Sequence, residues 1–283
     1  MFRPSAALLL ALTLGPAGFT AELDGADYDA AEIMRRAFDR SEELYENLLR
    51  YTYVERVEER DFDSSGRVSE TRSKTWDMQP LFGAQHARLI GRDGKPLSPE
   101  VEAKEQRKLD RLTEERAKET SAQRERRLAK EREDGDEMRR IIAEAKKAYG
   151  YRVVGEETMR GHEAWVIEAT PRASYQPAFW KASFLKGVRG KVWIAKRDDG
   201  WLKAEAESID TLSVAWFLFR LDKGATLAFE QSPLDDGAWM LDWFELRFKA
   251  RLALVKGYNR LMRADYRDYR RYDAASPEKP EAE

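Results

Sequence analysis

The sequence predicts an α+β fold in which most of the chain forms an antiparallel β-sheet. Three observations lead to this prediction. Runs of alternating apolar and charged residues recur along the chain, and Asp-Gly turns separate several of them, which is the pattern of β-hairpins. An amphipathic helix precedes these runs, and a long charged helix interrupts them. The chain contains no cysteine, so the sheet has to be stable without disulfides.

Residues 1–21 have the layout of a secretory signal peptide, with a positive charge at Arg3 followed by a short apolar run. We expect cleavage after Ala21, with Ala17 as the alternative. The apolar run is shorter than the ~20 residues that span a membrane, and no later stretch approaches that length. We therefore expect an exported, soluble periplasmic protein without a transmembrane segment, and a short retained membrane anchor is the alternative.

Length and charge indicate a single domain that does not bind nucleic acid. The remaining chain of roughly 260 residues is long enough to bury a core without disulfides. We expect one domain over residues 22–272, with a charged helical insertion over 99–136 and a disordered tail over 273–283. The net charge of −2 and pI of about 6.0 give no overall attraction to a phosphate backbone.

The first regular element is an amphipathic helix over residues 29–50. Its apolar residues recur every three or four positions, so they share one face that must be buried. Asp29 is the expected N-cap, with Glu32 completing a capping box. A long hairpin follows, with strands over 51–62 and 67–78, and residues 84–90 form a third strand.

The segment from Glu100 to Asp136 contains 11 Lys or Arg and 12 Asp or Glu residues and has no continuous apolar stripe. Ser98 followed by Pro99 is a typical helix start. We interpret this segment as a solvated or partly disordered excursion, and a partner-docking arm is the alternative. Gly135 is expected to end it, and a second helix over 138–149 then docks on the core.

The rest of the chain predicts a ladder of hairpins. Leu202, Ala204 and Ala206 are expected to face one way while the lysine and glutamates between them face the other. The predicted strands cover residues 151–158, 162–169, 191–197, 201–209, 226–232, 238–249, 251–255 and 258–272.

Two aromatic-rich segments, 171–187 and 213–221, interrupt this ladder. Ordinary closure of the core is one interpretation, because aromatic clusters usually belong to cores. A lid over a lipid-sized cavity is the other, since small-ligand sites are concave and mostly apolar.

The order of these elements resembles that of a known superfamily. The hairpin over residues 190–204, with Trp193 and Ile194 before the turn and Asp199, Gly200 and Trp201 after it, is similar to a hairpin of the lipoprotein-carrier superfamily, which includes LolA, LolB and RseB. This resemblance implies a strongly curved, half-open β-barrel with helices in a hydrophobic concavity. The charged insertion is a departure from that fold, and the carrier's lid-closing arginine has no clear position here.

No residue pattern in the sequence is typical of a known kind of catalytic site. The chain has two histidines, His86 and His162, and lacks zinc-protease, phosphate-loop and nucleophile-elbow motifs. Acidic pairs at residues 198–199 and 235–236 fall at predicted turns, where turn chemistry explains them. We therefore expect no metal, no cofactor and no enzymatic activity, and a hydrolase with an unrecognised carboxylate pair is a weaker alternative.

The leading hypothesis is a periplasmic protein that binds or carries a lipid or an acylated lipoprotein. The alternative is a structural or sensor protein of the cell envelope that binds a protein partner through the charged helix. The candidate ligand contacts in the concavity and its lid are Trp180, Phe184, Trp193, Trp201, Trp216, Phe217, Trp243 and Phe244. The candidate head-group or partner contacts are Arg247, Lys249 and Arg251, which could equally be charges that protect a sheet edge.

Overall fold

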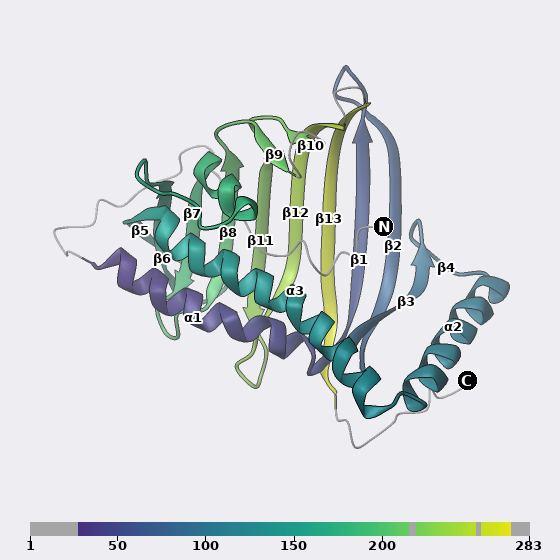
Figure 1. Cartoon of the computed structure of the whole chain (residues 1–283). Helices are drawn as coiled ribbons and strands as arrows, with labels where there is room; N and C mark the ends of the chain where they lie inside the picture. Colours follow the sequence, from purple (N-terminus) through teal and green to yellow (C-terminus); the bar gives the residue numbers. More distant parts are fainter. Residues whose placement is uncertain (1–27, 215–218, 253–255, 273–283) are drawn as a thin grey trace.

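The computed structural model describes residues 28–214, 219–252 and 256–272, and these form one antiparallel sheet with helices on one face (Figure 1). The strands are β1 (Tyr51–Phe62), β2 (Val68–Leu81), β3 (Ala84–Arg92), β4 (Lys95–Pro96), β5 (Tyr149–Met159), β6 (His162–Pro171), β7 (Val188–Ala195), β8 (Trp201–Ser208), β9 (Leu212–Val214), β10 (Phe219–Leu221), β11 (Thr226–Pro233), β12 (Trp239–Leu252) and β13 (Lys256–Arg271).

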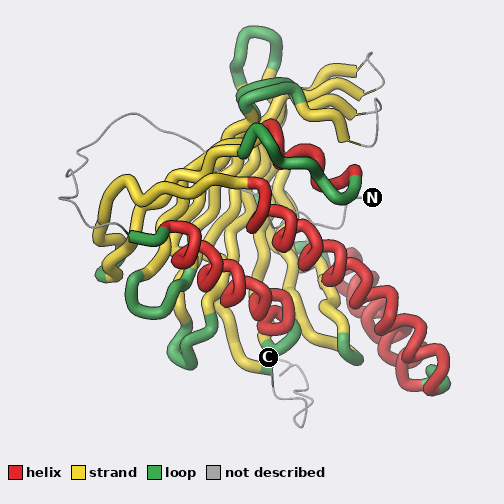
Figure 2. The backbone as a smooth tube through the Cα atoms, turned by 60° about the vertical axis from the view of Figure 1, so that its left-hand side comes forward, coloured by secondary structure: helices red, strands yellow, loops and turns green. Residues whose placement is uncertain are grey.

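The strand order confirms a half-open barrel. In the described chain the sheet has 13 strands, in the order β4-β3-β2-β1-β13-β12-β11-β8-β7-β6-β5, with β10 beside β12 and β9 beside β10. The first and last long strands, β1 and β13, are therefore neighbours near the centre. The outer strands β4 and β5 do not pair with each other, so the sheet stays open, and Figure 2 shows it curving around the helices.

Helix α1 (Ala30–Leu48) forms where its periodicity predicts it. The Asp29 carboxylate accepts hydrogen bonds from the backbone N–H groups of Ala31 and Glu32, each at 3.1 Å, and these bonds cap the helix. The apolar face of α1 packs against the sheet, and we call the sheet face that it covers the concave face. Among the side chains of α1 that the structure describes, the buried ones are Ala30, Ile33, Met34, Ala37 and Phe38.

The structure corrects the expected break at Gly135. Helix α2 (Pro99–Ala117) ends at Lys118, and helix α3 (Ser121–Ala148) runs through Gly135 without interruption. A glycine inside a helix costs only about 1 kcal/mol relative to alanine, which the rest of this helix can offset. The real start of α3 is the capping box of Thr120 and Gln123, a signal that was readable in the sequence.

Helix α2 is largely solvated, as expected, but the start of α3 is fixed to the sheet. No side chain of α2 is buried. Leu128 of α3 packs against Gly83 in the β2–β3 turn, and the Arg127 guanidinium donates hydrogen bonds to the Phe82 carbonyl at 3.1 Å and to the Glu119 carboxylate at 2.9 Å. The pairing with Arg127 and Arg116 lowers the pKa of Glu119 to about 2. These contacts attach the α2–α3 corner to the β2–β3 turn.

We expect Arg127→Gln to loosen this corner without unfolding the sheet. The variant loses the charged pair with Glu119, so backbone amides of α2 and of the first turns of α3 should exchange with solvent faster, whereas those of β1 and β12 should not change. Hydrogen exchange followed by mass spectrometry measures this difference. Arg126→Gln removes an exposed neighbouring charge and is the control. Unchanged exchange in both variants would contradict the role of Arg127.

A β-bulge changes the predicted alternation in β8. Trp193 pairs with Lys203, but the next residue, Ile194, pairs with Trp201, so Leu202 lies in the bulge. Leu202 therefore packs in a small cluster on the outer face of the sheet, the face opposite the helices, while Ala204 and Ala206 pack in the main core. The expectation that all three share one face was wrong. Within the described part of the chain, no helix is long and apolar enough to cross a membrane.

Candidate functional site

The concave face divides into a closed part and an open part. Over β5 to β8, helices α1 and α3 and the 3-10 helix η2 (Trp180–Gly187) cover the sheet and complete the main core. Ile167, Ile194 and Ala204 have no exposed surface there. In Figure 1, α1 and α3 cross only the lower parts of β11, β12 and β13, so no described helix lies over the upper parts of these strands.

Two adjacent rows of side chains mark the boundary between these parts. One row crosses the sheet through cross-strand pairs and is buried; it consists of Phe229, Phe244, Ala264 and Val57. The next row upward consists of Leu227, Leu246 and Met262, which are only half-buried, and Phe248 lies one step beyond Leu246 on the same face. We call Leu227, Leu246, Phe248 and Met262 the apolar floor.

The apolar floor has a charged border on the side of β1. There Arg260 pairs with Asp61 at 2.7 Å and with Glu59 at 3.2 Å, and Arg72 of β2 pairs with Asp61 at 2.8 Å. Met262 pairs in register with Glu59, so the apolar and charged residues are direct neighbours. An amphiphile has this same division between a hydrocarbon chain and a polar group. The arrangement could therefore accommodate an acyl chain on the floor with its polar end at the border.

A buried carboxyl group lies on the same strand as this border. Glu55 of β1 is only 2% exposed and pairs in register with Tyr266 of β13 and Trp76 of β2. Its single hydrogen bond within the described chain comes from the Tyr266 hydroxyl at 3.1 Å, and no described cation pairs with it. Burial raises the pKa of Glu55 to about 7, because the charged form loses its water. Burial also raises the pKa of Tyr266 well above its ordinary value.

Three of the predicted ligand contacts lie on the concave face. The Trp201 indole nitrogen donates a hydrogen bond to the Ala37 carbonyl at 2.8 Å, and its ring is 5.3 Å from that of Phe38, so Trp201 is occupied in holding α1. Phe184 of η2 packs against the main core, and Phe244 is 3% exposed. These residues close the core beside the apolar floor.

Trp193 and Trp243 are placed on the outer face, which corrects their assignment to the concavity. Trp193 donates to Glu157 at 2.7 Å and lies beneath the Lys203 ammonium, 4.6 Å from its ring centre. Trp243 lies beneath the Arg263 guanidinium at 4.6 Å. Successive residues of a strand point to opposite faces, so Trp243 cannot share a face with its neighbour Phe244.

The remaining predicted contacts are at the periphery. Trp180 at the start of η2 is 55% exposed. Trp216 and Phe217, the centre of the expected lid, lie outside the described residues. The Arg247 guanidinium is 4.2 Å from the Phe62 ring centre, while Lys249 and Arg251 are exposed.

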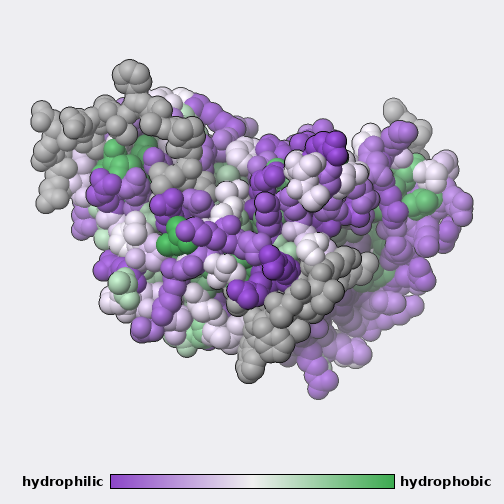
Figure 3. Space-filling view, turned by 90° about the horizontal axis from the view of Figure 1, so that it is seen from above, coloured by the Kyte–Doolittle hydropathy of each residue, from purple (hydrophilic) through white to green (hydrophobic). Residues whose placement is uncertain are grey.

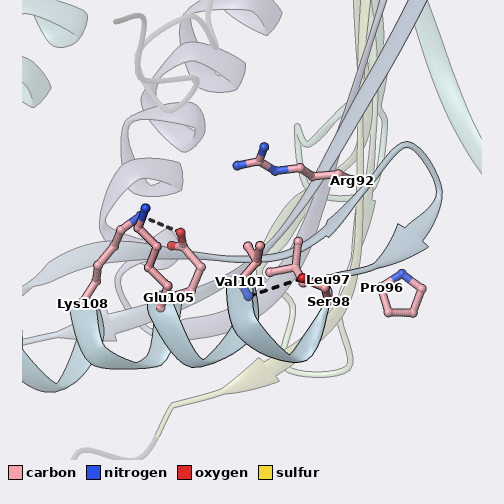
Figure 4. Close-up of a pocket in the computed structure, with 8 residues that line it drawn as sticks. Arg92, Pro96, Leu97, Ser98, Val101, Glu105 and Lys108 are labelled. Carbon is pink, nitrogen blue, oxygen red and sulfur yellow. Dashed lines mark hydrogen bonds and ion pairs between the residues drawn. The ribbon is translucent and has the colours of Figure 1, made fainter.

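A hollow of about 380 Å³ lies between the β3–β4 hairpin and the start of α2 (Figure 4). Several of its polar groups have partners: Glu105 pairs with Lys108 at 2.5 Å, and the Ser98 hydroxyl accepts from the backbone N–H of Val101 at 3.4 Å. These contacts start and stabilise the helix. Its full lining consists of Arg92, Pro96, Leu97, Ser98, Val101, Lys104, Glu105 and Lys108.

The described residues contain no group of three or more His, Asp or Glu side chains arranged to hold a metal ion. The surface seen in Figure 3 is mainly hydrophilic, and hydrophobic residues gather there in small areas. The apolar floor with its charged border is therefore the arrangement we take as the candidate site.

Comparison with known proteins finds similarity to solved structures. No family model matches the chain, and no curated protein matches it. A domain classed as an outer membrane lipoprotein-sorting protein from Vibrio parahaemolyticus is 11% identical, with a TM-score of 0.35 and coverage of 88% of this chain and 94% of that one. A LolA superfamily protein from Nitrosomonas europaea is 10% identical, with a TM-score of 0.28 and coverage of 85% and 94%.

A DUF1329 family protein from Desulfovibrio piger is 12% identical, with a TM-score of 0.26 and coverage of 86% of this chain and 94% of that one. The Nitrosomonas europaea structure is named as one of the LolA superfamily, which the hairpin over residues 190–204 also resembles. At these identities and TM-scores the similarity adds nothing to the description of the site.

The sequence pointed to tryptophans and missed the aliphatic floor. Leu246 and Phe248 were recognisable as one face of an alternating strand, but only the strand order places Leu227 and Met262 beside them. The position of Glu55 could be predicted from the sequence. Tyr51, Tyr53, Glu55 and Val57 are spaced two residues apart in β1, so Glu55 lies on the same face as three apolar residues.

Proposed function

We propose that this protein is an exported, non-enzymatic periplasmic protein that binds or carries a hydrophobic ligand, a lipid or an acylated lipoprotein, on the open part of its concave face. The observation that supports this proposal is the half-buried row of Leu227, Leu246 and Met262 directly beside a buried row of the core. An acyl chain laid on that row would extend the core by one layer. Each buried CH₂ group contributes about 0.8 kcal/mol.

The charged border gives the ligand an orientation. Hydrocarbon is excluded from the Arg260–Asp61 pair, because covering these charges would remove them from water without a new partner. A polar end of the ligand can instead remain near Arg260 and Arg72, which are partly exposed. The ligand is therefore an amphiphile with at least one long aliphatic chain.

We expect the double variant Leu246→Gln/Met262→Gln to bind a fluorescent long-chain fatty acid about tenfold more weakly, which corresponds to the loss of about 1.4 kcal/mol. Both residues lie on the apolar floor, and glutamine keeps their approximate length while adding a polar end. A probe titration gives Kd, and urea unfolding confirms that the variant is folded.

Leu261→Gln is the matched control. Leu261 is the direct neighbour of Met262 in β13, is also half-buried, and points to the other face of the sheet. Its variant should keep the wild-type Kd. Equal Kd values for the floor variant, the control and the wild type would refute the apolar floor as the ligand site.

One observation favours the alternative of a structural or sensor protein. No side chain of helix α2 is buried, so much of its surface is available to a protein partner. Native mass spectrometry of protein purified from its own cell envelope separates the two functions. A co-purifying lipid mass supports the carrier, whereas an apo mass together with a bound protein supports the alternative.

A further inference from the structure

The ends of β10 and β12 carry a group of cations for which the described residues provide no ion pair. Arg220 of β10 pairs in register with Arg251 of β12, and both side chains are exposed. Lys249 lies two positions before Arg251 on the same face, and Lys223 follows β10. We call these four residues the cationic tip. Like charges directly opposite each other in a sheet are destabilising, so a bound anion would stabilise this arrangement.

Within the described chain, no carboxylate forms an ion pair with any residue of the cationic tip. The two undescribed segments next to the tip, residues 215–218 and 253–255, contain no acidic residue. Asp222 lies beside Lys223, and its backbone N–H donates to the Lys249 carbonyl at 2.8 Å, so one carboxylate adjoins the four cations. The tip therefore keeps a local positive charge even though the whole chain has a net charge of −2.

Other cations of the same outer face are paired with carboxylates. Arg263 pairs with Asp265 at 2.9 Å, and Lys203 pairs with Glu205 at 2.5 Å. Arg189 pairs with Glu207 at 3.0 Å. These three cations are compensated, whereas Arg247, which precedes Lys249 on this face, stacks on the Phe62 ring and has no carboxylate partner among the described residues.

The opposite face of the same strands is apolar and continues into the apolar floor. Leu221 alternates with Arg220 in β10, and Leu221 pairs in register with Ala250 of β12. Phe248 and Leu246 follow on that face of β12. The tip thus presents cations on one face and leads to the proposed acyl-chain site on the other. A lipid bilayer presents anionic phosphates for the cations and hydrocarbon for the apolar face. An acidic protein presents anionic groups only.

An exposed tryptophan belongs to the neighbouring element. Leu212 of β9, the strand beside β10, packs against Gly187 of η2. A Cβ added to Gly187 would lie 2.6 Å from the Leu212 side chain. Helix η2 begins with Trp180, which is 55% exposed, and carries two exposed lysines: Lys181 pairs with Glu137, and Lys186 donates to the Gln176 amide oxygen at 3.1 Å. Tryptophan and lysine side chains are favoured where a protein meets the head-group region of a bilayer.

We propose that the cationic tip docks this protein on the surface of a bilayer that contains anionic lipids, with the apolar floor opening toward the membrane. The orientation of the floor rests on the proposed carrier function, whereas docking itself does not. Arg220, Lys249 and Arg251 contact head-group phosphates, and Trp180 lies at the same interface.

The test is co-sedimentation of the mature protein with vesicles of phosphatidylcholine, with and without phosphatidylglycerol. Wild-type protein should bind only the vesicles that contain phosphatidylglycerol, and added salt should weaken binding. The triple variant Arg220→Gln/Lys249→Gln/Arg251→Gln should partition on the order of 100-fold more weakly, because each basic residue near an anionic surface contributes about a fivefold increase in partitioning.

The control is Lys104→Gln/Arg107→Gln/Arg111→Gln, which removes three exposed cations from α2 and changes the net charge equally. It should retain wild-type binding. The proposal is overturned if wild-type protein does not bind the anionic vesicles, or if the two triple variants lose binding equally. Binding to immobilised polyglutamate but not to vesicles would also overturn it, in favour of an acidic protein partner.

Failure of docking and failure of the carrier function are distinguishable. The tip variant should bind the fluorescent fatty acid with wild-type Kd in the absence of vesicles, because none of its substitutions lies on the apolar floor. The Leu246→Gln/Met262→Gln variant should sediment with anionic vesicles as the wild type does.

Discussion

Glu55→Gln is expected to stabilise the protein above pH 7, by up to about 3 kcal/mol in the free energy of unfolding. Glu55 is almost fully buried on the concave face, with one hydrogen bond from Tyr266 and no described cation beside it. Ionisation therefore leaves an uncompensated charge in the core. Glutamine keeps the shape and an acceptor for the Tyr266 hydroxyl but cannot ionise.

The direction of the pH dependence follows from the pKa of Glu55, which burial raises from 4.5 to about 7. The folded state binds this proton more tightly than the unfolded state, so its stability is complete below pH 4.5 and falls as the pH rises through about 7. Urea unfolding near pH 4.5 and at roughly pH 8.5, the two sides of that window, should show the wild type losing stability while Glu55→Gln does not.

Glu58→Gln is the control from the same strand. Glu58 lies on the opposite face of β1 and is paired with Arg56 and Arg60, which lower its pKa. Removing its charge should give no gain in stability at high pH. If Glu55→Gln and the wild type show the same pH dependence, Glu55 acquires a cationic partner or water that the structure does not show, and its assignment as an uncompensated acid fails.

Gly200→Ala is expected to destabilise the protein by about 1–3 kcal/mol, because it overpacks a closed cluster on the outer face. A Cβ at position 200 would lie 2.1 Å from the Trp239 indole. Trp239 is 6% exposed and donates to the Asp198 carboxylate at 3.1 Å, so the ring cannot move without losing both its packing and that hydrogen bond. Thermal or urea unfolding measures the loss.

Gly155→Ala in β5 is the matched control, since no atom lies within 4 Å of an added Cβ at that position. This variant should be neutral or slightly stabilising, because alanine restricts the unfolded chain. Equal stability of the two alanine variants would show that the Trp239 ring can relax away from position 200.

The elements that the sequence predicts well are those with local signals. Helix α1 has both its apolar period and its Asp29 cap, and the hairpins have Asp-Gly or Ser-Gly turns between alternating strands. The error at Gly135 came from reading a change of composition as a helix end. The cap at Thr120, which is the stronger physical signal, lies at the true boundary.

The candidate site could be predicted only in part, because faces depend on bulges and neighbours. Trp193 and Trp243 are in strands predicted to form the curved sheet, yet both point away from the concavity. Trp193 alternates with the buried Val192 and Ile194 of β7, and the bulge opposite it lies in β8, where it places Leu202 on the outer face. No local pattern in the sequence marks that bulge.

The sequence by itself determined the antiparallel strands, the order of the hairpins, the solvated surface of α2 and the absence of disulfides. Each of these follows from the period, turn residues or composition of a short segment. Only the tertiary structure decided that β1 pairs with β13, which places Glu55 beside Tyr266. It likewise decided that β10 pairs with β12, which sets Arg220 opposite Arg251. These pairs join residues far apart in the chain, and their partners are selected by the closure of the whole sheet, which no segment encodes alone.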